Sequence, residues 1–123
     1  MDTKCGMSPL IDQPAISRFI RDHDEPGIEI RVNFGVFAGR HATPAEIDEL
    51  AGALGELVPV FAILAEERHE FAGSVEAKVH QVVVEVPRDH AGTEPDFLAG
   101  QIVQAANGWA LECIASRHGQ GDL

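Results

Sequence analysis

The amino-acid sequence predicts one small domain of the α+β class. Three features support this prediction: a segment of alternating apolar residues, two segments with helical capping and spacing, and two β-rich segments separated by a short turn. The chain has 123 residues, of which 45% are hydrophobic, which is enough for a single core. The predicted order of elements along the chain is β-α-β-β-α.

The first predicted strand spans residues 28–36. Apolar residues recur there at every second position, with polar residues or glycine between them. This period of two is typical of a strand that turns one face toward the core. The apolar set consists of Ile28, Ile30, Val32, Phe34 and Val36.

The first predicted helix begins after Thr43, which is a favourable N-cap. Pro44 suits the first helical position, and Glu46 completes a capping box with Thr43. Gly55 and Pro59 mark the C-terminal end. Apolar residues recur at helical spacing on one side, namely Ile47, Leu50, Ala51, Leu54, Leu57 and Val58.

Residues 60–71 and 75–87 are both β-rich and predict a hairpin that turns at Gly73 and Ser74. This register places all the apolar pairs on one face, whereas a three-residue loop would place Arg68 opposite Lys78, two like charges. The predicted cross-strand pairs are Phe61–Val86, Ile63–Val84, Ala65–Val82, Glu67–His80 and His69–Lys78.

A second helix is predicted over residues 93–118, and it is apolar around most of its circumference. One face of a three-stranded sheet does not cover so wide an apolar surface. The apolar residues are Phe97, Leu98, Ile102, Val103, Ala105, Ala106, Trp109, Ala110, Leu111, Cys113 and Ile114.

These elements predict a ferredoxin-like split β-α-β-β-α arrangement, with both helices on one face of a three-stranded sheet. A right-handed crossover makes the first two strands parallel, and the hairpin inserts the third between them, which gives the order 1-3-2. The strand at residues 28–36 is then an open edge, which favours pairing with another chain. Together with the apolar second helix, this edge predicts a homodimer.

The predicted domain spans residues 28–118. Residues 1–27 are expected to form a flexible or loosely docked arm, in which a short amphipathic turn around Ile16, Phe19 and Ile20 contacts the body. Residues 119–123 are expected to form a tail.

The charge balance argues against several classes of partner. The chain has 9 basic and 20 acidic residues and a formal net charge of −11, which disfavours nucleic acid and anionic lipid. We expect neither a signal peptide nor a membrane span. The two cysteines, Cys5 and Cys113, show no motif spacing, so we expect a cytoplasmic protein.

The segment FGVFAGRHATPAE, residues 34–46, is the first candidate site. Arg40 and His41 precede a helix N-terminus, where free N–H groups and the helix dipole favour an anion. Thr43 and Glu46 already satisfy two of those N–H groups, however, and Glu46 puts a negative charge at the same place. We therefore interpret this corner as mainly structural, with Arg40 and His41 as candidate ligand-binding residues.

The predicted hairpin register supplies the second candidate site. It brings Glu67, His69 and His80 to one face, beyond the apolar pairs. Two imidazoles and a carboxylate are suitable ligands for a divalent transition metal. Glu67 and His80 are alternatively suited to act as a catalytic acid–base couple. The simpler interpretation is a hairpin end that is polar because it is hydrated, and Lys78 beside His69 disfavours a cation.

We predict a self-associating module that binds a protein or small-molecule partner. The basis is the open strand edge, the apolar second helix and the absence of a convincing catalytic set. The alternative is a small enzyme or metal-binding protein that uses Glu67, His69 and His80, with Arg40 orienting an anionic substrate. The sequence indicates no particular cofactor.

Overall fold

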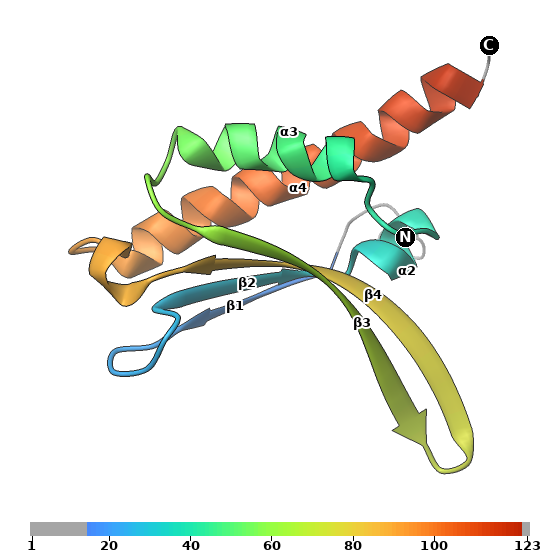
Figure 1. Cartoon of the computed structure of the whole chain (residues 1–123), viewed down its shortest axis with the longest axis horizontal. Coiled ribbons are helices and arrows are strands. Elements are labelled where there is room, and N and C mark those ends of the chain that lie inside the picture. Colours follow the sequence, from blue (N-terminus) through green and yellow to red (C-terminus); the bar gives the residue numbers. More distant parts are fainter. Residues whose placement is uncertain (1–14, 122–123) are drawn as a thin grey trace, which may run out of the picture.

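The computed structural model describes residues 15–121, which form an α+β fold, as predicted (Figure 1). The strands and helices are packed in two layers, with α3 and α4 on the same face of one sheet. In chain order the elements are β1 (Ile16–Ile20), β2 (Ile28–Val32), α2 (Phe34–Ala38), α3 (Pro44–Gly55), β3 (Ala62–Ala72), β4 (Val75–Val86), the 3-10 turn η1 (Arg88–His90) and α4 (Pro95–Gly121).

The sheet has four strands in the order β1-β2-β4-β3, and each neighbouring pair is antiparallel. The prediction of a three-stranded ferredoxin-like sheet is therefore wrong in the number of strands. The order β2-β4-β3 agrees with the order that was predicted for those three strands. The additional strand is β1, which pairs with the free side of β2.

β1 lies in the segment for which we predicted a loosely docked arm with an amphipathic turn. Ile16 and Ile20 pack against the core, whereas Phe19 is 43% exposed. The free edge of β2 offers backbone hydrogen-bond partners that an isolated turn lacks, so strand pairing outweighs the helical spacing of these residues. Residues 16–20 consequently belong to the sheet, while residues 1–14 lie outside the described part of the chain.

The strand predicted over residues 28–36 ends at Val32, and the chain continues as the short helix α2. Phe34 stays buried in the core, but Val36 is 71% exposed. The helix ends at Gly39, which has φ +74° and donates its N–H to the Gly35 carbonyl at 2.7 Å. A left-handed glycine at this place ends the helix without strain.

The predicted register of the hairpin is confirmed. Ile63 pairs with Val84, Ala65 with Val82 and Glu67 with His80. Gly73 has φ +64°, the left-handed conformation that glycine adopts without a steric cost.

The homodimer prediction loses its first basis, because β2 lies between β1 and β4 and is not an edge. The edges of the described sheet are β1 and β3. The second basis is reduced as well, because α4 packs against β1, β2 and α3. Ala110 on α4 is fully buried, and the large apolar side chains that remain exposed on this helix are Phe97 and Leu111.

The predicted capping box of α3 is confirmed, and Pro44 is the first residue of the helix. α4 continues through Gly121, beyond the residue at which we predicted the tail to begin. In residues 15–121, no helix has the length and apolar character needed to cross a membrane.

The core lies between the inner face of the sheet and the two long helices. Its fully buried large side chains come from β2, β4, α2, α3 and α4, and include Ile28, Ile30, Val32, Phe34, Leu50, Leu54, Val82, Val84, Val86 and Ile102. Burial of each such side chain stabilises the fold by about 1.5–3 kcal/mol.

α2 approaches β4 closely at Gly35. A Cβ atom added to Gly35 would lie 2.9 Å from the Cβ of His80 and 3.0 Å from the backbone N and O of His80. Glycine is therefore required for this contact, which places α2 directly against the strand that carries His80.

We predict that Gly35→Ala destabilises the fold by about 1–3 kcal/mol, because the new methyl group collides with the backbone of β4. Urea unfolding of the variant and the wild type measures the change in the free energy of unfolding. Gly52→Ala is the matched control, since Gly52 is an exposed glycine in α3 with no atom within 4 Å of the added Cβ. The control should stabilise by up to about 1 kcal/mol through helix propensity. Equal effects of the two substitutions would contradict the close contact.

Candidate functional site

The loop between α2 and α3 is held by Glu46. Arg40 donates two hydrogen bonds to the Glu46 carboxylate, at 2.8 and 2.7 Å. The same carboxylate accepts the Thr43 N–H at 2.9 Å, and the Glu46 N–H donates to Thr43 Oγ1 at 3.1 Å. This combination of a bidentate ion pair and a capping box gives the loop one defined conformation.

Trp109 of α4 joins this junction to the core. Its indole N–H donates to the Glu46 carbonyl oxygen at 2.7 Å. Its ring stacks on Phe34 with centroids 5.1 Å apart, and the Arg40 guanidinium lies 5.6 Å from the Phe34 ring centroid. α2, the loop, α3 and α4 therefore meet at one point.

The electrostatics of the junction follow from these contacts. Hydrogen bonds from Arg40 lower the pKa of Glu46 to about 2 and outweigh the opposing effect of burial. Burial raises the pKa of the Cys113 thiol to about 12, and the nearby Glu46 charge acts in the same direction. Cys113 is buried in α4 and remains a neutral core residue, as its position on the apolar helix predicts.

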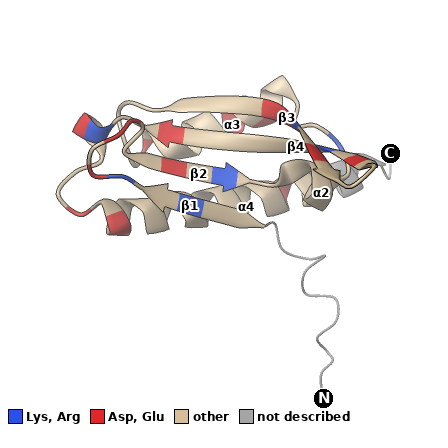
Figure 2. Cartoon of the chain, turned by 90° about the horizontal axis from the view of Figure 1, so that it is seen from below, with Lys and Arg blue, Asp and Glu red and all other residues tan. Residues whose placement is uncertain are grey.

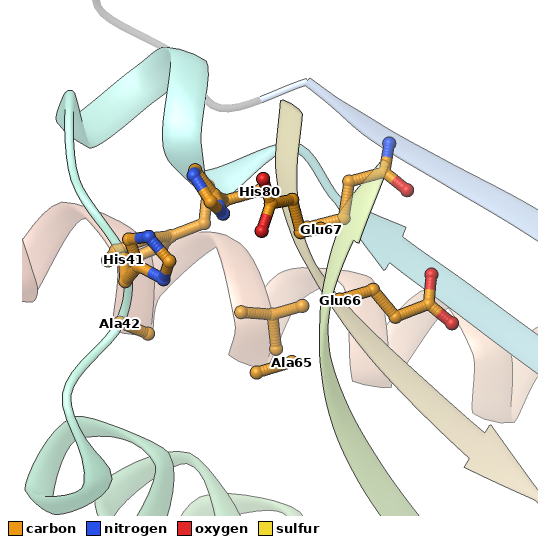
Figure 3. Close-up of a pocket in the computed structure, with 9 residues that line it drawn as sticks. His41, Ala42, Ala65, Glu66, Glu67 and His80 are labelled. Atoms are coloured by element: carbon orange, nitrogen blue, oxygen red, sulfur yellow. The ribbon is translucent and has the colours of Figure 1, made fainter. Parts of the chain in front are cut away.

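A hollow of about 220 Å³ lies between this loop and the β3–β4 hairpin (Figure 3). Apolar and polar side chains contribute to its wall in similar proportion. The lining residues are Phe34, His41, Ala42, Ala65, Glu66, Glu67, His80, Gln81 and Val82.

Three polar side chains from separate segments meet at the hollow. His41 comes from the loop, His80 from β4, and Glu67 from β3 directly opposite His80. The rings of His41 and His80 are in contact, with centroids 3.6 Å apart and planes inclined by 39°. Figure 3 shows these three side chains around one space.

His69 is placed differently from Glu67 and His80. It does not line the hollow and interacts through Nδ1 with the Glu76 carboxylate on the exposed part of the hairpin. Its Nε2 lies 3.9 Å from Glu67 Oε2. Among residues 15–121 no group of three or more His, Cys, Asp or Glu side chains has an arrangement suited to a metal ion. Metal binding by Glu67, His69 and His80 stays a prediction, which elemental analysis of the purified protein tests.

Arg40 and His41, which we predicted together as ligand-binding residues, also have different environments. The Arg40 guanidinium is occupied by Glu46 and donates to the His41 carbonyl oxygen at 2.8 Å. An anion at Arg40 would have to compete with the Glu46 carboxylate. The His41 ring instead faces the hollow, where it contacts His80.

The register of the hairpin predicted that Glu67 and His80 are neighbours, but it did not predict that His41 joins them. That contact depends on how the loop folds back over the sheet, and no local sequence pattern predicts the path of this loop. Gly35 is the one sequence feature that is consistent with a close approach at this place.

Comparison with known proteins yields no match to a family model, to a curated protein or to a solved structure. The functional interpretation therefore depends on the geometry of the site.

We predict that Glu46→Gln lowers the free energy of unfolding at pH 7 by about 1–3 kcal/mol, because the ionised carboxylate holds Arg40 and Thr43. The pKa of Glu46 is lowered from 4.5 to about 2 in the folded protein. The stabilisation is thus complete above pH 4.5 and is lost as the pH falls toward 2.

Urea unfolding of both proteins between pH 7 and pH 2 measures this difference. Glu49→Gln is the control, because Glu49 is an exposed glutamate on the same helix. A difference between wild type and Glu46→Gln that stays constant down to pH 2 would contradict the assignment.

Proposed function

We propose that the protein binds a small molecule in the hollow between the α2–α3 loop and the β3–β4 hairpin, and that His80 and Glu67 act there as an acid–base couple. The observation that carries this proposal is the meeting of His41, His80 and Glu67, three polar side chains from three segments, at one hollow. A hairpin end that is polar only because it is hydrated would not need an approaching loop with a second imidazole.

The chemistry follows from the cross-strand position of Glu67 and His80. Side chains of directly opposed residues have Cβ atoms about 4.5–5.5 Å apart, so the carboxylate is within reach of the imidazole. The Glu67 carboxylate lies 3.9 Å from His69 Nε2, and a rotation toward His80 would let it orient that imidazole and stabilise the imidazolium that forms when the ring accepts a proton. His41 adds a second imidazole that can donate to, or accept from, the bound molecule.

The lining residues define the class of ligand. They include no lysine or arginine, and Glu67 contributes a carboxylate. Glu66 also lines the hollow, but its carboxylate pairs with Arg31. An anionic ligand is therefore disfavoured, and a neutral or cationic one is favoured. The apolar wall formed by Phe34, Ala65 and Val82 suits a hydrocarbon part of the ligand.

The size of the hollow limits the ligand further. Its volume of about 220 Å³ is below the 300–1,000 Å³ (roughly) that is typical of pockets for drug-sized molecules. We therefore propose a small neutral or cationic molecule that carries one hydrogen-bonding group, such as an amine, alcohol or amide. Arg40 has an indirect role, since it holds the loop that carries His41.

Binding is tested by NMR, with ¹⁵N-labelled protein and a set of single-ring amines, alcohols and amides. We expect dissociation constants of about 1 mM or lower for some of these compounds, with amide shifts concentrated at Ala42, Ala65 and Val82. A set of single-ring carboxylates should bind more weakly. Shifts that concentrate elsewhere, or equal binding of the carboxylates, would overturn the proposed ligand class.

Catalysis is tested with His80→Ala in a screen of esters, amides and isomerisable carbonyl compounds. Any activity should fall about 100-fold or more, which is the usual contribution of a general acid or base. His90→Ala is the matched control, because it removes an exposed imidazole from η1. His69→Ala should also keep activity if no metal is involved. Retention of activity by His80→Ala would remove the acid–base role.

A further inference from the structure

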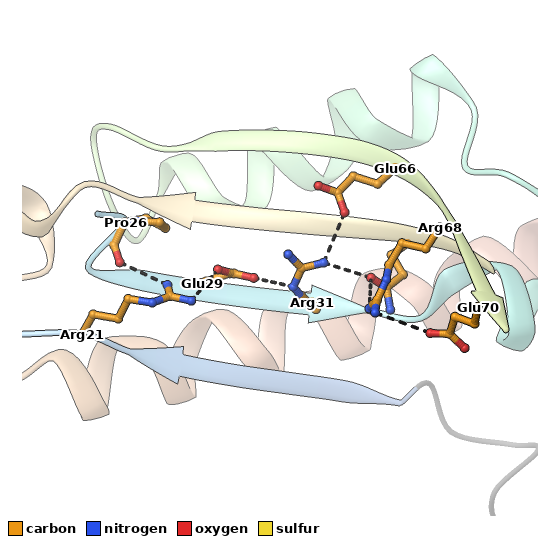
Figure 4. A network of polar contacts seen from close by, with 8 residues as sticks. Arg21, Pro26, Glu29, Arg31, Glu66, Arg68 and Glu70 are labelled. Carbon is orange, nitrogen blue, oxygen red and sulfur yellow. Dashed lines mark hydrogen bonds and ion pairs between the residues drawn. The ribbon is translucent and has the colours of Figure 1, made fainter. Parts of the chain in front are cut away.

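The face of the sheet opposite α3 and α4 carries a network of ion pairs. No helix of residues 15–121 covers this face, as seen from below in Figure 2. We call it the outer face. It presents the side chains of Phe19, Glu29, Arg31, Glu66, Arg68, Gln81 and Glu85, and Arg21 extends over it from the end of β1 (Figure 4).

Glu29 is the centre of the network, although it is only 6% exposed. Arg21 donates to its carboxylate at 2.9 Å, and Arg31 donates to the other oxygen. Burial by itself raises the pKa of Glu29, but the hydrogen bonds from Arg21 and Arg31 outweigh it and lower the pKa. Glu29 is therefore ionised at neutral pH and holds both arginines in place.

The network continues across β4 to β3. Arg31 contacts Glu66 at 3.2 Å and Gln81 at 3.0 Å. Arg68 donates to Gln81 at 3.3 Å and pairs with Glu70 at 3.6 Å. Charged side chains of alternating sign thus follow one another across the sheet, each held by its neighbours before any partner arrives.

The outer face carries little net charge in a strongly acidic protein. Glu85 of β4 also lies on it, directly opposite Glu29, but it is not part of the network of ion pairs. The three arginines of this network, Arg21, Arg31 and Arg68, balance the three glutamates to which they are paired, Glu29, Glu66 and Glu70. The chain as a whole carries a formal net charge of −11. Two copies of this chain repel each other where acidic surfaces meet, but this repulsion is smaller where two nearly neutral faces meet.

The outer face also contains an apolar anchor. Phe19 lines a shallow depression of about 510 Å³ together with Arg21, Glu29, Arg31, Glu66 and Arg68. Phe19 is 43% exposed, and the centroid of its ring lies 5.8 Å from the Arg21 guanidinium carbon. Arginine faces stack well on aromatic rings, so the depression is suited to a second phenylalanine.

We propose that two copies of the chain associate through their outer faces, with Phe19 of each copy seated in the depression of the other. A two-fold axis brings the same surface of both copies together, so every contact between a residue of one copy and a residue of the other occurs twice. Arginines of one copy meet glutamates of the other, and the preformed ion pairs limit the entropy that is lost on association. The small area of a four-stranded face makes this dimer weak and dependent on concentration.

This dimer differs from one that uses α4 or an open strand edge. An α4 interface would depend on Phe97, which is 64% exposed on the other layer of the molecule. Phe19 and Phe97 are therefore matched positions: both are exposed phenylalanines, and each lies on only one of the two competing surfaces.

Sedimentation velocity of wild type, Phe19→Glu and Phe97→Glu from about 2 to about 200 µM tests the proposal. We expect the wild-type sedimentation coefficient to rise with concentration from the monomer value toward the dimer value. Phe19→Glu should remain monomeric throughout, and Phe97→Glu should behave as the wild type. Phe19→Ala introduces no charge and should raise the dissociation constant about fivefold or more.

Trp109 fluorescence and circular dichroism verify that each variant is folded. If Phe19→Glu does not fold, Phe19→Ala alone decides the outcome. A wild type that stays monomeric at all concentrations overturns the proposal. So does a dimer that Phe97→Glu abolishes, which places the interface on α4, or a dimer that neither phenylalanine affects, which points to a strand edge.

Discussion

The contact between Glu46 and its three partners is the constraint on which the rest of the structure depends. Its carboxylate caps α3 and holds Arg40, while its carbonyl oxygen accepts the indole N–H of Trp109. One residue thus connects a loop, a helix start and the helix that covers the sheet. A negative charge is also favourable at this end of α3, because it faces the positive end of the helix dipole. The same charge makes the corner a poor site for an added anion. The Arg40 guanidinium therefore stabilises the loop.

The candidate site lies where the helices cease to cover the hairpin. The inner face of the sheet packs against the core as far as Ile63 on β3 and Val82 on β4, and from Ala65 and His80 onward its side chains reach solvent. At this boundary the sheet can carry polar side chains that stay partly hydrated, so their presence does not cost the free energy that burial would. The α2–α3 loop closes one side of the space, because Gly35 permits α2 to pack directly on β4. A partly enclosed hollow with polar groups results, and this geometry distinguishes the site from the rest of the exposed hairpin.

The two faces of the sheet have different properties. The inner face is an apolar surface that α4 covers, whereas the outer face is a layer of paired charges around a nearly buried Glu29. An ion pair of this kind contributes little net stability, because desolvation of the charges offsets their attraction. Its contribution is better understood as specificity, since it holds arginines and glutamates in fixed positions on an open surface. In an acidic protein, a second acidic molecule meets less repulsion at such a nearly neutral face than at an acidic one.

The sequence by itself determined the features that depend on residues close together in the chain. Local spacing predicts the capping box of α3, the hairpin turn at Gly73 and the pairing of Glu67 with His80. The capping box needs only residues three apart, and the position of the turn fixes which residues of the two strands lie opposite each other. Only the tertiary structure decided that residues 16–20 form a strand, that β2 ends at Val32, and that His41 reaches His80. Each of these depends on a surface contributed by a distant segment. Backbone groups on the free edge of β2 outweighed a weak helical pattern, and the packing of α2 on β4 brought two imidazoles from separate segments into contact.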